Sequence, residues 1–321
     1  TRCSRDWSSD VCSSDLRNYN FSCEIERFIL FSFQVSVSAV HLMSNSGRLF
    51  QRHQEILVFL HFNMEYTLKK SLGHHFLRDE QICQRIVASL EAPLPAAVLE
   101  VGPGDGALTK YLMQREDFQL KCIEVDEEKV HWLLQHYPAL QGKLLHGSFL
   151  DLSPPFEEPF AIIGNFPYNI STQILFKVLT WRDQVPLLIG MFQKEVAQRI
   201  AATAGNKTYG ILSVLVQAYY EVQYLFEVSD RCFQPPPKVK SAVLRLRKLA
   251  VAPAVKSEAL FFQLVKTAFN QRRKKLRNAV RSLFEEEVLA QALFDQRAEQ
   301  LSIQNFAQLT FLMKAGSSTA V

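Results

Sequence analysis

Four consecutive residues, Asn165-Phe166-Pro167-Tyr168, carry groups that could hold and activate a planar amine. The carboxamide oxygen of Asn165 can accept a hydrogen bond from an exocyclic amine. Pro167 has no N–H and fixes the chain, so that a neighbouring carbonyl can accept a second hydrogen bond. The ring of Tyr168 offers a face for stacking. Two acceptors on the amine of an adenine would aim its lone pair at an electrophile. An ordinary Asn-Phe-Pro turn is the alternative interpretation.

A glycine-rich loop, Gly102-Pro103-Gly104-Asp105-Gly106, follows an apolar run and precedes a helical pattern. Glycines at a strand-to-helix turn let the backbone approach a ligand, and the helix N-terminus adds hydrogen-bond donors. A nicotinamide-dinucleotide fold would use the same position. The spacing here is GxGxG rather than GxGxxG, and Pro103 removes a donor that a pyrophosphate would need. A plain tight turn is the alternative.

A carboxylate stands where the next predicted strand ends, in Glu124-Val125-Asp126. At that position it can accept both ribose hydroxyls of an adenosine, whichever cofactor contains it. Glu124 therefore indicates an adenosine without choosing between cofactors. The alternative is that Glu124 caps the following helix, although Asp126 fits that role better.

The elements that position these residues read as alternating strands and helices. This alternation favours a parallel sheet with helices on both faces. The last two strands are separated only by the proline-containing loop Ser229–Lys240, so we expect them to form an antiparallel hairpin at one edge. The predicted strands are Ala97–Val101, Leu120–Val125, Lys143–His146, Phe160–Asn165, Leu187–Phe192, Glu221–Val228 and Ala242–Arg247, and the helices among them are Glu80–Leu90, Ala107–Arg115, Glu127–His136, Thr172–Leu179, Lys194–Ala202 and Ile211–Ala218.

Beyond Pro253 the pattern is helical only, and the positive charge of the chain lies there. Residues 251–321 hold ten Lys and Arg against six Asp and Glu, which accounts for the net charge of +4, since residues 64–250 hold twenty of each. Helical spacing places Arg273, Arg277 and Arg281 on one face, which suits an RNA backbone, and places the apolar residues Leu276, Val280 and Leu283/Phe284 on another. A solvated face partly paired with Glu285–Glu287 is the alternative. The predicted helices are Ser257–Phe269, Lys274–Phe284, Glu286–Phe294 and Ile303–Lys314, and the basic residues are Arg272, Arg273, Lys274, Lys275, Arg277 and Arg281.

The first 63 residues do not resemble the rest of the chain. They contain three of the six cysteines and an apolar run, Phe28–Met43, that is too short and too polar to span a membrane. We expect residues 1–63 to be a non-native or disordered extension, with Met64 as the natural start. The six cysteines form neither a disulfide scaffold nor a metal cluster, so a reducing cytoplasmic compartment is expected.

Several motifs in order resemble one enzyme family. Glu-Val-Gly-Pro-Gly-Asp-Gly with Asn-Phe-Pro-Tyr is similar to the class I S-adenosylmethionine-dependent N6-adenine methyltransferases. The segments 69–77, Phe233–Ser241 and Phe269–Asn278 narrow the resemblance to the small-subunit (16S) rRNA adenine N6,N6-dimethyltransferases of the KsgA type, over about residues 65–315.

This resemblance implies a role for particular residues. His75 and Leu77 would close over the methionine end of the cofactor, Gly102 would lie against it and Glu124 would bind its ribose. Ser148 stands where the family usually has an acidic residue, and it would accept a weaker hydrogen bond from the amine of the cofactor adenine. A second departure from the family pattern is His74, which replaces the usual glutamine.

On the substrate side, the resemblance implies that Asn165 and Pro167 hold the target amine, with Asn165 also at the cofactor. Tyr168 and Phe233 would stack on opposite faces of a flipped base. The alternative for Phe233 is an apolar residue that packs under the proline loop.

The expected fold is an α/β, Rossmann-like class I methyltransferase sheet of seven strands, the last antiparallel, with a small all-helical C-terminal domain. Residues 64–250 would bind S-adenosylmethionine and catalyse transfer, and residues 251–321 would bind rRNA. The expected cofactor is S-adenosylmethionine, which would leave as S-adenosylhomocysteine, and no metal ion is expected at the site.

The expected partner is 16S rRNA within the immature small subunit. No membrane partner is expected, and the protein is expected to be a monomer. The expected reaction is dimethylation of N6 on two adjacent adenosines near the 3′ end of that rRNA. The alternatives are a large-subunit rRNA adenine methyltransferase of the macrolide-resistance type, a non-catalytic ribosome-assembly factor and, most weakly, a nicotinamide oxidoreductase.

Overall fold

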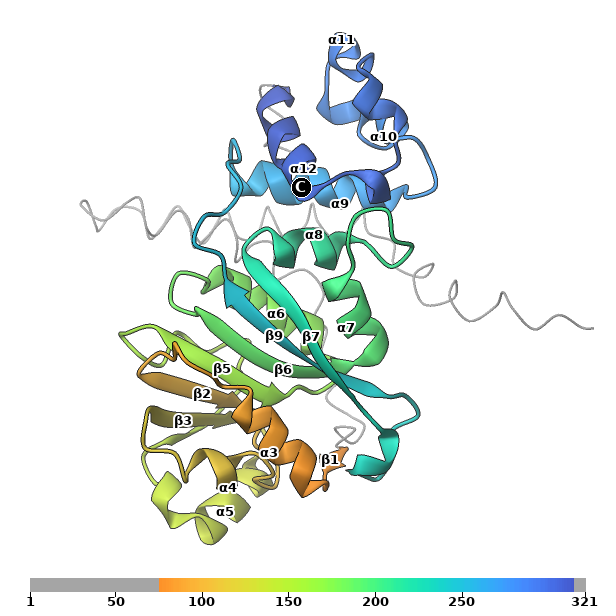
Figure 1. Cartoon of the computed structure of the whole chain (residues 1–321). Helices are drawn as coiled ribbons and strands as arrows, with labels where there is room; N and C mark the ends of the chain where they lie inside the picture. The colour runs from red at the N-terminus through yellow and green to blue at the C-terminus, as the bar shows by residue number, and fades with distance from the viewer. Residues whose placement is uncertain (1–74, 315–321) are drawn as a thin grey trace, which may run out of the picture. The chain divides into compact units, whose positions relative to one another are not determined.

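A computed structural model describes residues 75–314 of the chain, drawn in colour in Figure 1. The predicted extension 1–63, the start at Met64 and the His74 replacement lie outside the described residues. The described residues all belong to one compact unit, Glu65–Ala320.

The centre of the described fold is a mixed seven-stranded sheet with the order β4-β3-β2-β5-β6-β9-β7. Strands β2 to β6 are mutually parallel, whereas β9 is antiparallel to both of its neighbours. This arrangement confirms the predicted sheet and the predicted hairpin. The strands are β2 (Ala97–Val101), β3 (Gln119–Glu124), β4 (Leu144–His146), β5 (Phe160–Asn165), β6 (Leu187–Gln193), β7 (Tyr220–Val228) and β9 (Ser241–Lys248).

Helices cover both faces of this sheet (Figure 1). Alternate residues of a strand point to opposite faces. Val98 and Ile163 thus join a core with the first three helices, whereas Leu99 and Ile162 are buried on the other face. The helices are α3 (Glu80–Ala88), α4 (Thr109–Leu112), α5 (Glu127–His136), α6 (Ser171–Thr180), α7 (Lys194–Ala201) and α8 (Ile211–Gln217), with 3-10 turns at Pro138–Leu140 and Asp230–Cys232.

The central strands are buried along their length because both faces are covered. All five residues of β2 are buried, as are the first five of β5. Buried parallel strands read as continuous apolar runs, which is why their predicted bounds agree with the observed ones. Each of these strands ends at the same edge of the sheet, where the polar motifs follow.

A second, two-stranded sheet was not predicted. It pairs β1 (Phe76–Leu77) with β8 (Phe233–Gln234), in antiparallel orientation, with Leu77 opposite Phe233. Two residues per strand give no readable alternation, so this pairing had no local signal.

The C-terminal helical segment is more broken than predicted. We expected one basic helix over Lys274–Phe284, but the chain forms α10 (Leu276–Ala279) and a 3-10 turn, Arg281–Leu283. The amide of Leu276 donates to the carbonyl of Gln296 rather than continuing a helix from the preceding turn. Arg273 therefore lies before α10, and the expected common face with Arg277 and Arg281 is wrong.

The remaining C-terminal elements are likewise short. The predicted helix Glu286–Phe294 is divided, and Ile303–Lys314 ends early in a 3-10 turn. The apolar side predicted for residues 274–284 is nevertheless buried, with Leu276, Val280 and Phe284 inside. The elements are α9 (Glu258–Asn270), α11 (Glu286–Leu289) and α12 (Ile303–Leu309), with 3-10 turns at Ala292–Asp295, Ala298–Gln300 and Thr310–Leu312.

The C-terminal helices pack directly against the sheet-containing part. Helix α9 contacts α8, and the ring of the buried Tyr209 meets Phe269 edge-on with centroids 6.0 Å apart. Arg182 and Glu258 form a partly buried ion pair across the same junction. Across residues 75–314, no helix is both long and apolar enough to cross a bilayer.

Candidate functional site

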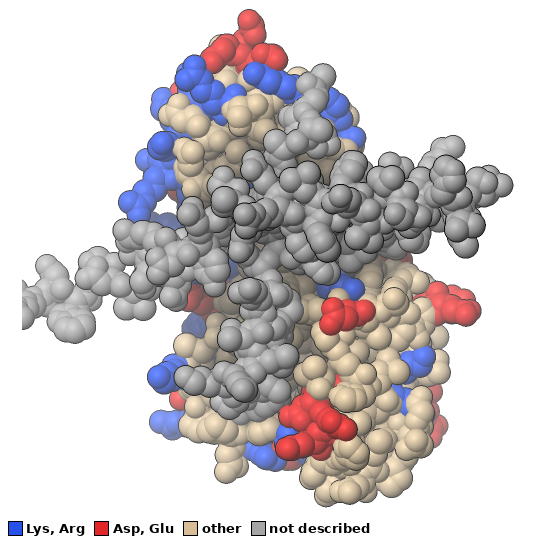
Figure 2. Space-filling model, turned by 180° about the vertical axis from the view of Figure 1, so that it is seen from behind, with Lys and Arg blue, Asp and Glu red and all other residues tan. Residues whose placement is uncertain are grey.

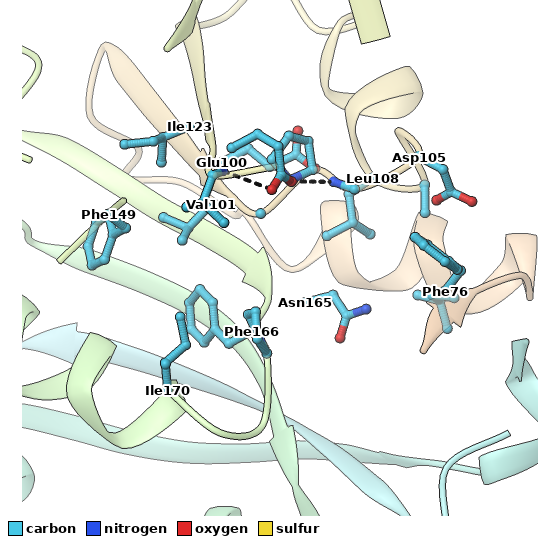
Figure 3. A pocket seen from close by; sticks show the side chains of 18 of the residues that line it. Phe76, Glu100, Val101, Asp105, Leu108, Ile123, Phe149, Asn165, Phe166 and Ile170 are labelled. Carbon is cyan, nitrogen blue, oxygen red and sulfur yellow. Dashed lines mark hydrogen bonds between the residues drawn. The ribbon is translucent and has the colours of Figure 1, made fainter. Parts of the chain in front are cut away.

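One cavity opens at the carboxyl edge of the parallel strands, and its lining comes from the ends of β2, β3, β4 and β5 (Figure 3). The strand order reverses between β2 and β5. Loops on either side of such a reversal diverge and leave a crevice where α/β proteins bind ligands. Eight residues predicted for the cofactor or the target base line it: His75, Leu77, Gly102, Glu124, Ser148, Asn165, Pro167 and Tyr168.

The glycine loop after β2 needs its glycines for conformation and space. Gly102 and Gly106 have φ of 69° and 81°, in the left-handed region that side chains disfavour. A Cβ on Gly106 would also lie 2.6 Å from the ring of Tyr137. A larger residue at either position would therefore displace the loop, whose residues Gly102 to Asp105 line the cavity.

The Glu124 carboxylate is held by three backbone amides. Gly104 N donates to Oε2 at 3.1 Å, and the amides of Val125 and Asp126 donate to Oε1 at 2.8 and 3.1 Å. Asp126 itself caps α5 by accepting from Glu128 N at 3.0 Å, so the capping alternative for Glu124 is wrong. Glu124 is a fixed acceptor at the cavity wall.

An apolar surface beside this carboxylate fits the adenosine end of the implied cofactor. The side chain of Val125 is 52% exposed although it lines the cavity, and Ile123 and Phe149 lie nearby in the same wall. A planar base placed there would cover exposed apolar surface. The hydroxyl oxygen of Ser148 accepts from Leu150 N at 3.2 Å and keeps further acceptor capacity.

A second carboxylate, Glu100, lies beneath the glycine loop and was not assigned a role from the sequence. It is 1% exposed and accepts a hydrogen bond from Thr109 Oγ1 at 2.8 Å. Desolvation raises the pKa of Glu100 to about 7, although the hydrogen bonds from Thr109 and the Cys122 thiol oppose that shift. In the sequence, Glu100 stands out as a charged residue within the apolar run before the glycine loop, and this was the signal that could have identified it.

The Asn165 carboxamide reaches into the cavity between Phe166 and Phe76 (Figure 3). Its Nδ2 donates to the main-chain oxygen of His75 at 3.5 Å. This contact leaves Oδ1 as the acceptor that faces the cavity. Phe166 is buried at 1% exposure and packs against Phe192, with ring centroids 5.3 Å apart, so it anchors the turn.

Tyr168 is fixed at its far end by a residue from β9. Its hydroxyl shares a 2.6 Å hydrogen bond with Ser241 Oγ, and burial raises the pKa of Tyr168. Ser241 is fully buried at the start of the strand. The sequence placed Ser241 at the end of the proline-loop motif but gave it no role; the structure shows that it positions the Tyr168 ring.

Phe233 does not reach the cavity with the others. It is 4% exposed and belongs to the same core cluster as Leu77, its partner across the two-stranded sheet. This position agrees with packing under the proline loop. Stacking of Phe233 on a flipped base stays a prediction, and it requires part of this packing to open.

The six basic residues predicted for RNA differ in their pairing. Arg272 pairs with Glu299, and Arg281 with Glu286. Lys275 and Arg277 both bind Asp295, and the hydrogen bond from Lys275 is the largest cause that lowers the pKa of that carboxyl. Within residues 75–314, Arg273 and Lys274 are exposed and make no ion pair.

The surface of the C-terminal segment shows this mixture of charges. Figure 2 shows Lys and Arg on both sides of this segment, with Asp and Glu gathered at its tip. Figure 1 places α11, which begins with Glu286 and Glu287, at that tip. The cationic surface is therefore patchy, and its unpaired charges lie at the turn before α10.

The chain is similar to proteins of one family over most of its length. Residues 65–314 match the family model described as ribosomal RNA adenine dimethylase. A relative from Cytophaga hutchinsonii, named ribosomal RNA small subunit methyltransferase A, is 50% identical over 249 residues, which cover 76% of this chain and 96% of that protein.

Two solved structures share the fold. A dimethyladenosine transferase from Plasmodium falciparum superposes with a TM-score of 0.60 at 22% identity and covers 73% of this chain and 96% of its own. The 23S rRNA methyltransferase ErmE gives a TM-score of 0.57 at 26% identity, covering 73% and 99%.

Proposed function

Because this chain belongs to the ribosomal RNA adenine dimethylase family, we propose that it dimethylates N6 of two adjacent adenosines near the 3′ end of small-subunit rRNA. The methyl donor is S-adenosylmethionine, and the substrate is 16S rRNA within the immature small subunit. One observation carries the proposal: the amide-held carboxylate of Glu124 and the Asn165–Tyr168 turn face the same cavity.

The cofactor would be held along the β2 to β4 side of the cavity. Glu124 would accept the ribose hydroxyls, Val125 would cover one face of the adenine and Ser148 would meet its amine. Gly102 leaves room for close approach, and His75 with Leu77 would cover the methionine end. When bound, S-adenosylmethionine supplies an electrophilic methyl group on its sulfonium.

The residues at the end of β5 act on the target amine. Asn165 Oδ1 and a main-chain carbonyl beside Pro167 accept hydrogen bonds from the two N–H groups of this amine. These hydrogen bonds turn the lone pair of N6 toward the methyl donor. Tyr168, held by Ser241, supports the ring of the extruded base. The alkylated amine releases a proton to water, so catalysis rests on positioning rather than on a general base.

The RNA would be held in part by the C-terminal segment. Arg273 and Lys274 carry charges with no acidic partner among the described residues, so they can contact phosphates without first breaking an ion pair. The other four basic residues already bind acidic groups of the same segment. We therefore assign RNA contact first to Arg273 and Lys274.

Methyl transfer to ribosomal particles tests this function. The purified protein is incubated with labelled S-adenosylmethionine and, in parallel reactions, with undermethylated small subunits and with large subunits, and the label is mapped. Label at N6 of two adjacent adenosines near the rRNA 3′ end is the expected result. Label confined to large subunits would instead establish the macrolide-resistance activity, and cofactor binding without transfer to either particle would indicate an assembly factor.

A further inference from the structure

One of the six basic residues predicted for RNA, Arg272, bonds to the sheet-containing part of the protein. Its Nε donates to Glu299 Oε2 at 2.5 Å, and its Nη2 donates to the main-chain oxygen of Lys207. Lys207 belongs to the loop between α7 and α8, residues 203–209, which we call the junction loop. The other paired members of the set form their ion pairs within the C-terminal segment; they are Lys275, Arg277 and Arg281.

The C-terminal segment holds the junction loop at further points. The carbonyl oxygen of Glu299 accepts from Gly205 N at 2.7 Å, so the residue that pairs with Arg272 also bonds to the loop. At the end of the loop, Tyr209 is 1% exposed and its ring meets Phe269 edge-on, three residues before Arg272. The loop is thus held near its start, in its middle and at its end.

The junction loop is also fixed to the helices that flank it. Gln217 Nε2, in α8, donates to the carbonyl oxygens of Ile200 and Ala202 at 2.7 and 2.8 Å. Ser213 Oγ donates to the carbonyl oxygen of Arg199. Both helices contact strand β7 of the main sheet. A group that bonds to this loop is therefore placed relative to the sheet, and through the sheet relative to the cavity.

Arg272 directly precedes Arg273 and Lys274, the residues to which we assign RNA contact. The amide of Lys274 donates to the carbonyl of Gln271 at 2.8 Å, which closes a turn around Arg272. A guanidinium is a rigid fork, so bonding to two acceptors fixes its direction and with it the turn. Such placement affects the rate, since an error of about 1 Å in the position of a reacting group can cost about 100-fold.

We propose that Arg272 is a positioning residue, which contacts no phosphate and ties the RNA-binding turn, Arg273 and Lys274, to the sheet-containing part. The inference rests on the proposed function. The charge pattern alone predicts a phosphate contact for Arg272, whereas its bonds to Glu299 and to the carbonyl of Lys207 favour the positioning role.

Arg272→Lys distinguishes the two roles, because lysine keeps the charge but lacks the fork that bonds two acceptors in fixed directions. A phosphate contact would largely survive this change. For a positioning residue, we expect kcat for methyl transfer at saturating small subunits to fall about 10-fold or more. The slope of log affinity against log salt should stay unchanged. Wild-type affinity for S-adenosylhomocysteine, measured by titration calorimetry, checks that the variant is folded.

Glu299→Ala provides a second test, in which the two roles predict opposite results. If Arg272 contacted phosphates, its release from Glu299 would tighten small-subunit binding and steepen the salt slope by about one. If Arg272 positions the turn, the variant should lower kcat as Arg272→Lys does and leave the slope unchanged. The double variant should be no slower than the slower single variant, because both changes break the same link.

Lys248→Ala is the matched control, because it also removes a cation from an ion pair, with Asp183 at 3.0 Å, away from the proposed RNA and cofactor contacts. It should keep the wild-type kcat and salt slope. Wild-type kcat in Arg272→Lys, or tighter binding with a steeper slope in Glu299→Ala, would overturn the inference. Absence of methyl transfer by the wild-type protein would instead contradict the proposed function.

Discussion

At the scale of single residues, substitution of Asn165 tests the proposed reaction most directly. Its Oδ1 is proposed to accept from the target amine, and a lost preorganised hydrogen bond at a reacting centre typically lowers the rate by about 100-fold or more. Asn165→Ala should therefore lower kcat by at least that factor while largely sparing the affinity for S-adenosylhomocysteine, measured by titration calorimetry.

Asn169 offers a control of the same chemistry. It lines the same cavity four residues later but is exposed, so Asn169→Ala should change kcat by less than about threefold, well below the effect expected of a preorganised group. Wild-type turnover in Asn165→Ala would show that the turn after β5 is not the reacting site.

The buried Glu100 should leave a signature in stability against pH. Burial raises its folded-state pKa to about 7, above the ordinary value of 4.5 for a glutamate. Below pH 4.5 the group is protonated in both states and its stability contribution is fully present. As the pH rises toward 7, the unfolded state releases the proton first, and about 3 kcal/mol of stability is lost.

Glu100→Gln removes this titration while keeping an acceptor for Thr109. The free energy of unfolding of the variant, relative to the wild type, should therefore be higher at pH 8 than at pH 5. Urea unfolding at the two pH values measures this difference directly. Equal differences at both values would mean that Glu100 ionises normally inside the protein.

At the scale of elements, the turn before α10 carries the proposed RNA contacts. Replacing Arg273 and Lys274 with Ala should weaken small-subunit binding and reduce the slope of log affinity against log salt by about one to two. The melting temperature should stay unchanged, because neither side chain makes an ion pair among residues 75–314.

Lys143→Ala is the control for this pair, since Lys143 is exposed next to β4 at the opposite end of the sheet-containing part. It should leave both the affinity and the salt slope as they are. An unchanged slope in the Arg273 and Lys274 variant would mean that RNA contacts the segment elsewhere.

The division of the C-terminal helices shows where periodicity fails. The spacing of Leu276, Val280 and Phe284 correctly predicted which side is buried. It did not predict the break before Leu276, because the amide of Leu276 bonds to Gln296, twenty residues later. Such a bond competes with helix continuation and leaves no mark in the local pattern.

At the scale of the whole molecule, the family match starts after the first 63 residues, at residue 65. Among residues 75–314, the lining of the cavity starts with His75. Removal of residues 1–63 should therefore leave the melting temperature and methyl transfer unchanged, measured by calorimetry and by label incorporation.

A deletion that extends through Leu77 provides the contrast. It removes β1 of the two-stranded sheet and the His75 carbonyl that orients Asn165, so we expect methyl transfer to fall to background. Loss of activity on removing residues 1–63 alone would give that segment a role that its sequence does not indicate.

The main elements and most of the cavity were readable from the amino-acid order, because their signals are local. Strand β2 is apolar apart from Glu100, and β5 is apolar up to Asn165. Gly102 directly follows β2, whereas Glu124 and Asn165 are the last residues of β3 and β5. In a parallel sheet all such strand ends meet at one edge, so local order also predicted a common site.

Contacts between distant residues settled the rest. The bond between Tyr168 and Ser241 joins positions 73 residues apart, and the bond between His75 and Pro235 joins positions 160 apart. The burial of Phe233 and the pairing of three of the six basic residues, Arg272, Lys275 and Arg277, depend on such neighbours too. A residue's type states what it can bind, but which group it meets depends on the packing of elements that the local pattern does not contain.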